Sequence, residues 1–194
     1  MQLDDTSLDG VKLISPRRFE DNRGFFSESY SRKSLAAQGI DIEFVQDNHS
    51  LSREAGTIRG LHFQAAPHAQ DKLVRCGRGA LFDVAVDIRK GSPTYGKWVG
   101  HELSFENGRQ MLVPAGFAHG FVTLLPDTEI IYKCSDYYAQ ETEGALLWND
   151  PDIGIDWPLH GDPVLSEKDA GAPPLQGFDS PFFWKGPSLL KGQP

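Results

Sequence analysis

The chain has 194 residues, of which 39% are hydrophobic and 24% charged, and its formal net charge is −8. This length suits one domain with a substantial core, and the composition is that of a soluble globular protein. The acidic balance argues against a nucleic-acid or membrane-surface partner, because both attract clustered Lys and Arg. It still permits an anionic small molecule, which a few convergent basic side chains can hold.

The sequence carries no sign of export. The N-terminal segment MQLDDTSLDG lacks the basic and then apolar pattern of a signal peptide, and no apolar run is long enough to cross a bilayer. Cys76 and Cys134 lie in strand-like segments and form no CxxC pair. We therefore expect two free, buried thiols and a cytoplasmic protein.

Helix is expected at only two places. The segment SRKSLAAQG predicts one short helix, with Ser31 as the N-cap and Gly39 as the stop. The segment SEKD, residues 166–169, predicts a further helical turn.

Short alternating runs separated by turn residues fill most of the chain. They cover residues 72–76, 80–89, 109–114, 119–125 and 129–138. One face of the run 80–89 carries Phe82, Val84, Val86 and Ile88. The other face carries Asp83, Asp87 and Arg89, so we expect a half-buried strand. Many short strands at this spacing predict an all-β sandwich, jelly roll or barrel.

The last part of the chain differs in amino-acid composition from the rest. Residues 171–194 contain nine Gly or Pro, which predicts an irregular extension after a single domain of residues 1–170. The extension also contains four aromatic residues, which we expect to pack on the body or on a partner subunit. They are Phe178, Phe182, Phe183 and Trp184.

The segment IRGLHFQ, residues 58–64, raises the question of a metal site. Metal-binding cupin barrels combine a His-x-His pair and a Glu with a later Pro-x-Gly-x-x-His, and PAGFAH at 114–119 fits the later part. The first part fails, because Gln64 replaces the second His and Lys72 follows where a carboxylate would help. An ammonium has no lone pair to donate and repels a cation. HELSF at 101–105 lacks the second His of HExxH, so the pattern disfavours a metal.

Metal-free acid/base chemistry is the alternative. A His held in one tautomer by a carboxylate can take a proton from carbon. A Lys within hydrogen-bonding range can stabilise the resulting enolate oxygen. Tyr132 and Tyr138 are six residues apart, so an unbroken strand would place both on one face.

The residues alone leave simpler roles open. His62 is also explained as a core histidine, and tyrosines in strands commonly serve packing. Ser166 and Asp169 fit a helix-capping pattern, and Arg23 lies in DNRG, which fits a solvated turn.

Nine segments in order resemble the dTDP-4-dehydrorhamnose 3,5-epimerase family of cupin-like barrels, over roughly residues 10–170. They are DNRGFFSESY, FVQDNHS, TIRGLHFQ, KLVRC, FDVAVDIRKGSPTYGKW, VPAGFAHGF, YKCSDYYAQETEG, WNDPDIGIDWP and LSEKDA. The resemblance implies a metal-free antiparallel β-sandwich or jelly roll. It also implies a homodimer with exchanged N-terminal strands, a dTDP-sugar substrate and no cofactor.

The resemblance also gives catalytic roles. His62 corresponds to the base that removes the protons at C3 and C5, beside the C4 ketone, and Asp169 corresponds to its carboxylate partner. Tyr132 corresponds to the acid that reprotonates the opposite face, and Lys72 to the group that steadies the C4 oxyanion. One ketone acidifies both neighbouring carbons, so one base and one acid can serve both centres.

The remaining matches imply substrate binding. Arg23 and Arg59 are suited to a diphosphate, and Tyr138 corresponds to a residue that stacks on thymine. We expect Gly60 to let its strand approach the ligand closely. Other family positions around the nucleotide and sugar are Phe26, Glu28, Gln46, Asn48, His119, Glu143 and Lys168.

The expected reaction converts dTDP-4-dehydro-6-deoxy-D-glucose to dTDP-4-dehydro-L-rhamnose. The nearest alternative is an epimerase that acts only at C3 or only at C5 of a related dTDP-4-keto-deoxysugar. Alternatives from other classes are a metal-dependent cupin oxygenase and a non-catalytic module that binds a sugar nucleotide.

Overall fold

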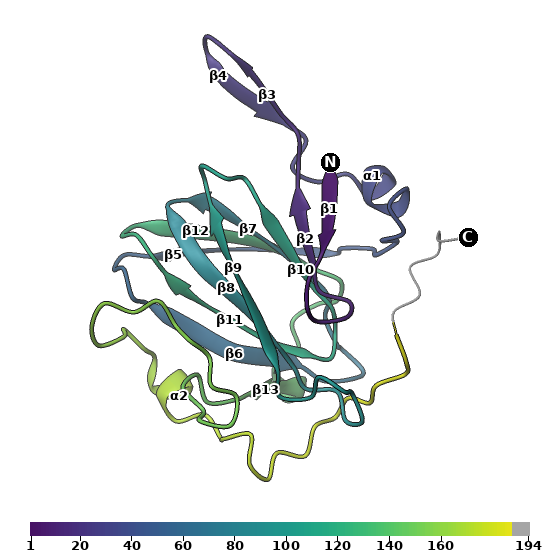
Figure 1. Ribbon diagram of the computed structural model, residues 1–194, viewed down its shortest axis with the longest axis vertical. Coiled ribbons are helices and arrows are strands. Elements are labelled where there is room, and N and C mark those ends of the chain that lie inside the picture. Colours follow the sequence, from purple (N-terminus) through teal and green to yellow (C-terminus); the bar gives the residue numbers. More distant parts are fainter. Residues whose placement is uncertain (188–194) are drawn as a thin grey trace.

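Two antiparallel sheets face each other in the computed structural model, which describes residues 1–187 (Figure 1). The six-stranded sheet has the order β1 (Gln2–Asp5), β2 (Lys12–Ser15), β10 (Gln110–Val113), β7 (Lys72–Arg78), β12 (Thr128–Cys134) and β5 (Gln46–Ser52). The five-stranded sheet has the order β13 (Glu143–Ala145), β6 (Ile58–Gln64), β11 (Phe117–Thr123), β8 (Ala80–Asp87) and β9 (Trp98–Ser104). The predicted antiparallel β-sandwich is confirmed.

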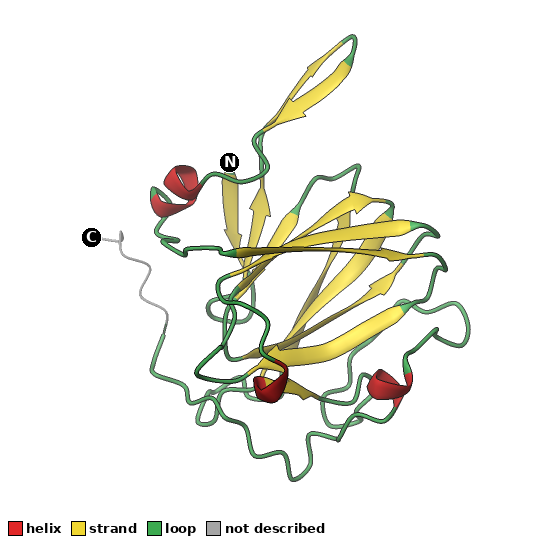
Figure 2. Ribbon diagram, turned by 180° about the vertical axis from the view of Figure 1, so that it is seen from behind, coloured by secondary structure: helices red, strands yellow, loops and turns green. Residues whose placement is uncertain are grey.

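Helices are short and lie outside the sandwich (Figure 2). Helix α1 (Arg32–Ala36) begins after Ser31, whose side chain accepts a hydrogen bond from the Ser34 N–H, as predicted for the N-cap. Gly39 follows with a φ of +85°, a conformation that glycine adopts without strain. Helix α2 (Glu167–Ala170) begins after Ser166, and η1 (Gln140–Thr142) is a single 3₁₀ turn. No helix among the described residues is long and apolar enough to cross a membrane.

The predicted strand runs overlap β7, β8, β10, β11 and β12, but the runs 80–89, 119–125 and 129–138 continue past the ends of their strands. The run 129–138 corresponds to β12, which stops at Cys134, so the strand prediction for residues 135–138 is wrong. The chain bends there around the Asp136 carboxylate. This carboxylate accepts hydrogen bonds from the Tyr137 N–H at 2.7 Å and from His68 Nδ1 at 3.2 Å.

Strand β8 has the predicted alternation, but its polar face does not meet solvent. Asp83 and Asp87 are both 0% exposed, so the half-buried interpretation is wrong. Their face points between the two sheets, together with Leu81 and Ala85, which belong to the core there. The opposite face, with Phe82, Val84, Val86 and Ile88, belongs to a second core on the outer side of the five-stranded sheet.

The segment after β13 covers that outer side. Phe178 and Phe182 pack against Phe63 of β6, with ring centroids 5.6 and 5.9 Å apart. Phe183 is 66% exposed in the chain, and the Lys90 ammonium lies 5.2 Å from its ring. Trp184 joins the same edge through its N–H, which donates to the Lys90 carbonyl at 2.9 Å. The predicted extension is thus irregular and packed as far as residue 187, and residues 188–194 lie outside the described part.

The space between the sheets divides into an apolar and a polar end. The apolar end includes Val74, Cys76, Leu103, Met111 and Ile130. Cys76 and Cys134 are free and buried, as predicted.

The hairpin of β3 (Arg18–Asp21) and β4 (Gly24–Ser27) projects away from the sandwich (Figure 1). Its three phenylalanines are exposed by 51%, 43% and 71% for Phe19, Phe25 and Phe26. Exposed apolar rings in this density are typical of a surface that contacts another molecule.

Candidate active site

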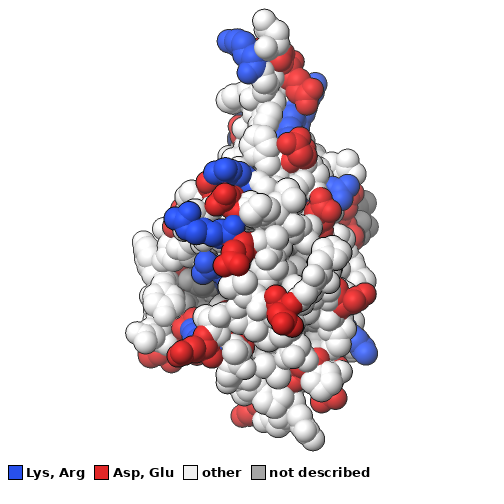
Figure 3. Space-filling view, turned by 90° about the vertical axis from the view of Figure 1, so that its left-hand side faces the viewer, with Lys and Arg blue, Asp and Glu red and all other residues white. Residues whose placement is uncertain are grey.

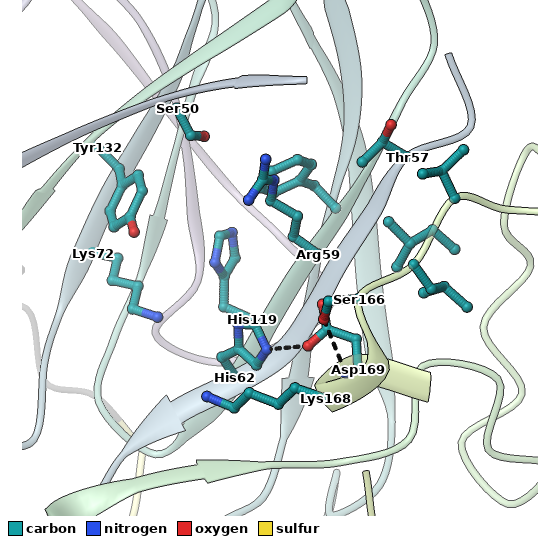
Figure 4. Close-up of a pocket in the computed structure, with 14 residues that line it drawn as sticks. Ser50, Thr57, Arg59, His62, Lys72, His119, Tyr132, Ser166, Lys168 and Asp169 are labelled. Atoms are coloured by element: carbon teal, nitrogen blue, oxygen red, sulfur yellow. Dashed lines mark hydrogen bonds and ion pairs between the residues drawn. The ribbon is translucent and has the colours of Figure 1, made fainter. Parts of the chain in front are cut away.

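The polar end of the sandwich holds a cavity of about 430 Å³, within the range of small-molecule sites (Figure 4). Seven of the candidate site residues that the sequence predicted line this cavity. They are Arg59, His62, Lys72, His119, Tyr132, Lys168 and Asp169.

The shortest polar contact in the cavity joins His62 of β6 to Asp169 of α2. His62 Nε2 lies 2.6 Å from Asp169 Oδ1, and the Asp169 side chain is only 5% exposed. A carboxylate accepts hydrogen bonds, so Nε2 donates and Nδ1 keeps the lone pair of the neutral ring. The pair therefore provides an oriented base.

Helix α2 holds the Asp169 carboxylate in place. The Ser166 side chain caps the helix by accepting from the Asp169 N–H at 3.1 Å, so the capping interpretation applies to the backbone of Asp169. The carboxylate itself points to His62 and also accepts from the Gly60 N–H at 3.4 Å. Burial alone would raise the pKa of Asp169, but the bonds from His62, Gly60 and Ser166 outweigh it and lower the pKa below 3.8. Asp169 is an anion at neutral pH.

The sheet requires a glycine at position 60. Its φ is +128°, and a Cβ there would lie 2.5 Å from Gly120 Cα and 2.8 Å from the His119 carbonyl oxygen. The pairing of β6 with β11 shifts register between His119 and Phe121. The close approach that this glycine permits here is thus between two backbones.

Lys72 and Tyr132 face His62 and Asp169 from the other sheet (Figure 4). Burial lowers the pKa of Lys72, although the charges of Cys134, Asp83 and Glu143 oppose the shift. Burial raises the pKa of Tyr132. A protonated phenol and an amine poised for hydrogen bonding therefore stand across the cavity from the base.

A polar network connects Lys168 to four further predicted residues at the edge of the cavity. Lys168 Nζ lies 2.6 Å from Glu143 Oε2, which also accepts from the Tyr138 hydroxyl at 3.3 Å. The Tyr138 N–H donates to Gln46 Oε1 at 3.0 Å, and Gln46 Nε2 donates to Asn48 Oδ1 at 3.0 Å. Because β12 ends before Tyr138, this ring reaches the site from a loop, and the prediction that it shares a strand face with Tyr132 is wrong.

Arg59 and His119 are held by neighbouring strands. The Arg59 guanidinium donates to Ser52 Oγ at 3.4 Å and to the Leu51 carbonyl at 3.3 Å. His119 Nε2 donates to Asp83 Oδ1 at 2.8 Å.

Three predicted residues lie outside this constellation. Arg23 and Phe26 belong to the projecting hairpin, where the exposed Arg23 side chain pairs with Asp21 at 2.6 Å. Glu28 follows the hairpin and accepts from Ser34 Oγ at 3.2 Å. None of the three lines the cavity of this chain.

The position that lacks a metal ligand has a structural role. The Gln64 amide donates to the carbonyls of His68 and Tyr137, and its oxygen accepts from the Ala139 N–H at 3.0 Å. Across residues 1–187, no group of three or more His, Cys, Asp or Glu side chains is arranged to hold a metal ion.

The sequence interpretation missed seven lining residues: Ser50, Thr57, Ile58, Phe121, Val164, Leu165 and Ser166. Ser50 and Phe121 continue the inward alternation of Gln46, Asn48 and His119, so strand periodicity could have found them. Val164 arrives through a parallel bridge to Thr57, which no local pattern encodes.

Basic side chains gather at this end of the sandwich, although the net charge of the chain is negative. Figure 3 shows the side where Figure 1 places the ends of β5, β11 and β12, with Lys and Arg beside a hollow. Arg59, Lys72 and Lys168 all line the cavity. The site is therefore suited to an anionic ligand.

Comparisons with known proteins agree with this geometry. A family model described as dTDP-4-dehydrorhamnose 3,5-epimerase matches residues 5–177. A relative of that name from Sinorhizobium fredii is 58% identical, covering 90% of each chain. One from Salmonella typhimurium is 54% identical, covering 88% of this chain and 93% of the relative.

Solved structures with similar folds contain nucleotides. The Bacillus anthracis epimerase with TDP and PPi bound has a TM-score of 0.87 and 51% identity, covering 90% of this chain and 99% of that one. The Legionella pneumophila enzyme in complex with dTDP-4-keto-L-rhamnose has a TM-score of 0.88 and 48% identity, covering 92% and 94%. A 3'-monoepimerase from Streptomyces bikiniensis, in complex with dTDP-quinovose, has a TM-score of 0.83 and 36% identity, covering 88% and 86%.

Proposed function

The chain belongs to the dTDP-4-dehydrorhamnose 3,5-epimerase family, and we propose that it inverts C3 and C5 of dTDP-4-dehydro-6-deoxy-D-glucose. The observation that carries the proposal is the His62–Asp169 pair facing Lys72 and Tyr132 in one cavity. The product is dTDP-4-dehydro-L-rhamnose, and no redox change occurs in the reaction.

The first step is removal of a proton from carbon. His62 Nδ1 takes the proton at C3 or C5, and the C–H electron pair becomes the enolate of the C4 ketone. The Asp169 anion stabilises the imidazolium that forms, through the 2.6 Å contact to Nε2. Lys72 donates a hydrogen bond to the C4 oxyanion, where the negative charge develops.

The second step delivers a proton to the opposite face. Tyr132 extends from the sheet opposite His62, and its raised pKa keeps the phenol protonated at neutral pH. It donates a proton to the enolate carbon and the ketone re-forms. His62 then releases its proton to solvent, and Tyr132 takes up a proton from solvent. Repeating the cycle at the second carbon inverts both centres.

The network at the cavity edge is proposed to bind the rest of the substrate. Arg59 contacts the diphosphate, and Tyr138 stacks on thymine. The sugar and nucleotide contact the remaining polar residues, which are Gln46, Asn48, His119, Glu143 and Lys168. We also place the protein in the cytoplasm, in accord with the two unpaired thiols and a nucleotide-sugar substrate.

We propose a homodimer that exchanges N-terminal strands. The hairpin carries Arg23 and Phe26 away from its own cavity and exposes three phenylalanines. In an exchanged dimer, these residues and Glu28 would complete the site of the partner. Mixing an Arg23→Ala chain with a His62→Ala chain tests this arrangement, because mixed dimers should regain one intact site. Failure of mixed samples to exceed either variant alone would argue against shared sites.

Isotope exchange tests the reaction. Incubation with dTDP-4-dehydro-6-deoxy-D-glucose in deuterated water should place deuterium at both C3 and C5 of the sugar. Replacing His62 with Asn should abolish exchange at both carbons. Absence of deuterium with the unaltered protein would refute the proposed function.

Epimerisation at a single carbon is the second candidate. The similar fold of the Streptomyces bikiniensis 3'-monoepimerase favours it. Deuterium at C3 alone in the same experiment would assign the chain to that class.

A further inference from the structure

The Tyr138 ring stands at the edge of the cavity on a segment that belongs to no sheet. Strand β12 ends at Cys134 and η1 begins at Gln140, so residues 135–139, here called the Tyr138 loop, form neither strand nor helix. Tyr138 is 58% exposed, which leaves little packing to fix its ring. The position of the ring therefore depends on hydrogen bonds to the backbone of this loop.

One side chain, Gln64 of β6, holds the Tyr138 loop on both sides of Tyr138. Its Nε2 donates to the Tyr137 carbonyl at 2.9 Å, and its Oε1 accepts from the Ala139 N–H at 3.0 Å. Nε2 also donates to the His68 carbonyl of a neighbouring loop. Gln64 is only 5% exposed, so water does not replace these bonds.

The three partners of the Gln64 side chain require an amide. Two carbonyl oxygens lie at its nitrogen and one N–H lies at its oxygen, so a flipped amide would oppose all three. An ionised carboxylate of the same size could keep only the bond from Ala139, because it has no hydrogen to donate.

The same strand reaches Tyr138 by a second route and also carries the base. Gln64 pairs across the sheet with Glu143 of β13, whose Oε2 accepts from the Tyr138 hydroxyl at 3.3 Å. His62 lies two residues before Gln64, on the same face of β6. Strand β6 therefore fixes both the base and the loop that presents the Tyr138 ring.

We propose that Gln64 is a positioning residue that holds the Tyr138 loop in the conformation that binds the nucleobase of the substrate. Gln64 does not line the cavity, so it acts through Tyr138 and contacts neither sugar nor base. The inference rests on the proposed function, in which Tyr138 stacks on thymine.

The test is the affinity of Gln64→Glu for dTDP, measured by calorimetry, together with its KM and kcat. This substitution keeps the size of the side chain but turns an oxygen toward the Tyr137 carbonyl, so the loop should move. The Kd for dTDP and the KM should both rise about tenfold, which is the order of the contribution of stacking on an aromatic ring. The kcat should stay within about threefold, because the contact between His62 and Asp169 is unaltered.

Asp150→Asn is the matched control for disturbing a buried hydrogen-bonded loop. Asp150 is 1% exposed, lies outside the cavity lining, and accepts from the Leu175 N–H at 2.8 Å. Its substitution should lower the melting temperature and leave the Kd for dTDP within about twofold. In a Tyr138→Ala background, Gln64→Glu should change the Kd by less than about twofold, because the ring that Gln64 positions is gone.

An unchanged dTDP affinity in folded Gln64→Glu, or a tenfold loss that persists in the Tyr138→Ala background, would overturn the inference. A fall in kcat with unchanged dTDP affinity would also overturn it, since Gln64 would then act on His62. If Gln64→Glu does not fold, amide hydrogen exchange of the unaltered protein decides. Saturating dTDP should slow exchange of the Ala139 N–H at least tenfold, and unchanged exchange would overturn the inference.

The proposed function fails by a different result. Unaltered protein that binds dTDP but incorporates no deuterium into the sugar would overturn the proposed reaction, whereas the inference about Gln64 is decided by dTDP affinity. The two failures are therefore distinguishable.

Discussion

The contact between His62 and Asp169 allows a quantitative prediction for Asp169→Asn. The substitution keeps the shape of the side chain and removes its charge. The carboxylate is 5% exposed and lies 2.6 Å from Nε2, so no solvent replaces the lost interaction. The imidazolium formed during proton removal loses its charged partner.

The expected magnitude follows from the hydrogen bond. A bond to a charged group contributes about 1.5–3 kcal/mol, and a tenfold rate change corresponds to about 1.4 kcal/mol. Proton removal should therefore slow by about 10- to 150-fold. If the NH₂ group of the new Asn side chain turns toward His62 Nε2, this nitrogen must accept the hydrogen bond and the ring proton moves to Nδ1. Nδ1 then has no lone pair to take the substrate proton, so the rate will fall further.

The assay is the initial rate of deuterium incorporation at C3, measured with saturating substrate. Asp87→Asn is the control for removing a buried carboxylate outside the cavity, and its rate should stay within about threefold of the unaltered protein. An Asp169→Asn variant with the unaltered rate would refute the assignment of Asp169 as partner of the base.

Tyr132→Phe should retain deuterium incorporation at C3 but lose inversion, because the base can return a deuteron only to its own face; inverted product by NMR would contradict this. Gly60→Ala should lower the free energy of unfolding by about 3 kcal/mol in denaturant titration, since its Cβ would lie 2.5 Å from Gly120 Cα. Gly24→Ala shares the φ of +128° without a neighbour within 4 Å, so an equal loss there would remove the clash explanation. Burial would raise the pKa of Asp87, but bonds from its loop lower it below 3.8. The Asp87 carboxylate therefore contributes fully to the free energy of unfolding above about pH 4, and this contribution is lost as the pH falls through its lowered pKa. In Asp87→Asn, the free energy of unfolding should depend less on pH in that range.

Local periodicity was sufficient to find β7, β8, β10, β11 and β12, and it singled out the segment 58–64 that forms β6. The alternation in 80–89 correctly separated two faces, and Ser31 and Gly39 correctly bounded the first helix. The alternation did not reveal which face was interior. In a sandwich with an active site between its sheets, polar residues point inward and apolar ones pack under the C-terminal segment, which reverses the usual inference.

Contacts distant in sequence were the part that no local pattern could supply. The pairing of His62 with Asp169 spans 107 positions and was available only through the family resemblance. The bend at Asp136, which moves Tyr138 off β12, depends on His68 from another loop. Gly60 was correctly singled out, but its neighbour is the backbone of Gly120, which only the sheet register reveals.

Strand β6, which carries His62, also has an outward side. His62 faces the cavity, and the next residue, Phe63, faces outward to Phe178 and Phe182. The C-terminal segment therefore supports β6 from its outer side, at the residue next to His62. Substitutions of Phe178 or Phe182 should thus alter the packing behind His62 without changing the lining of the cavity.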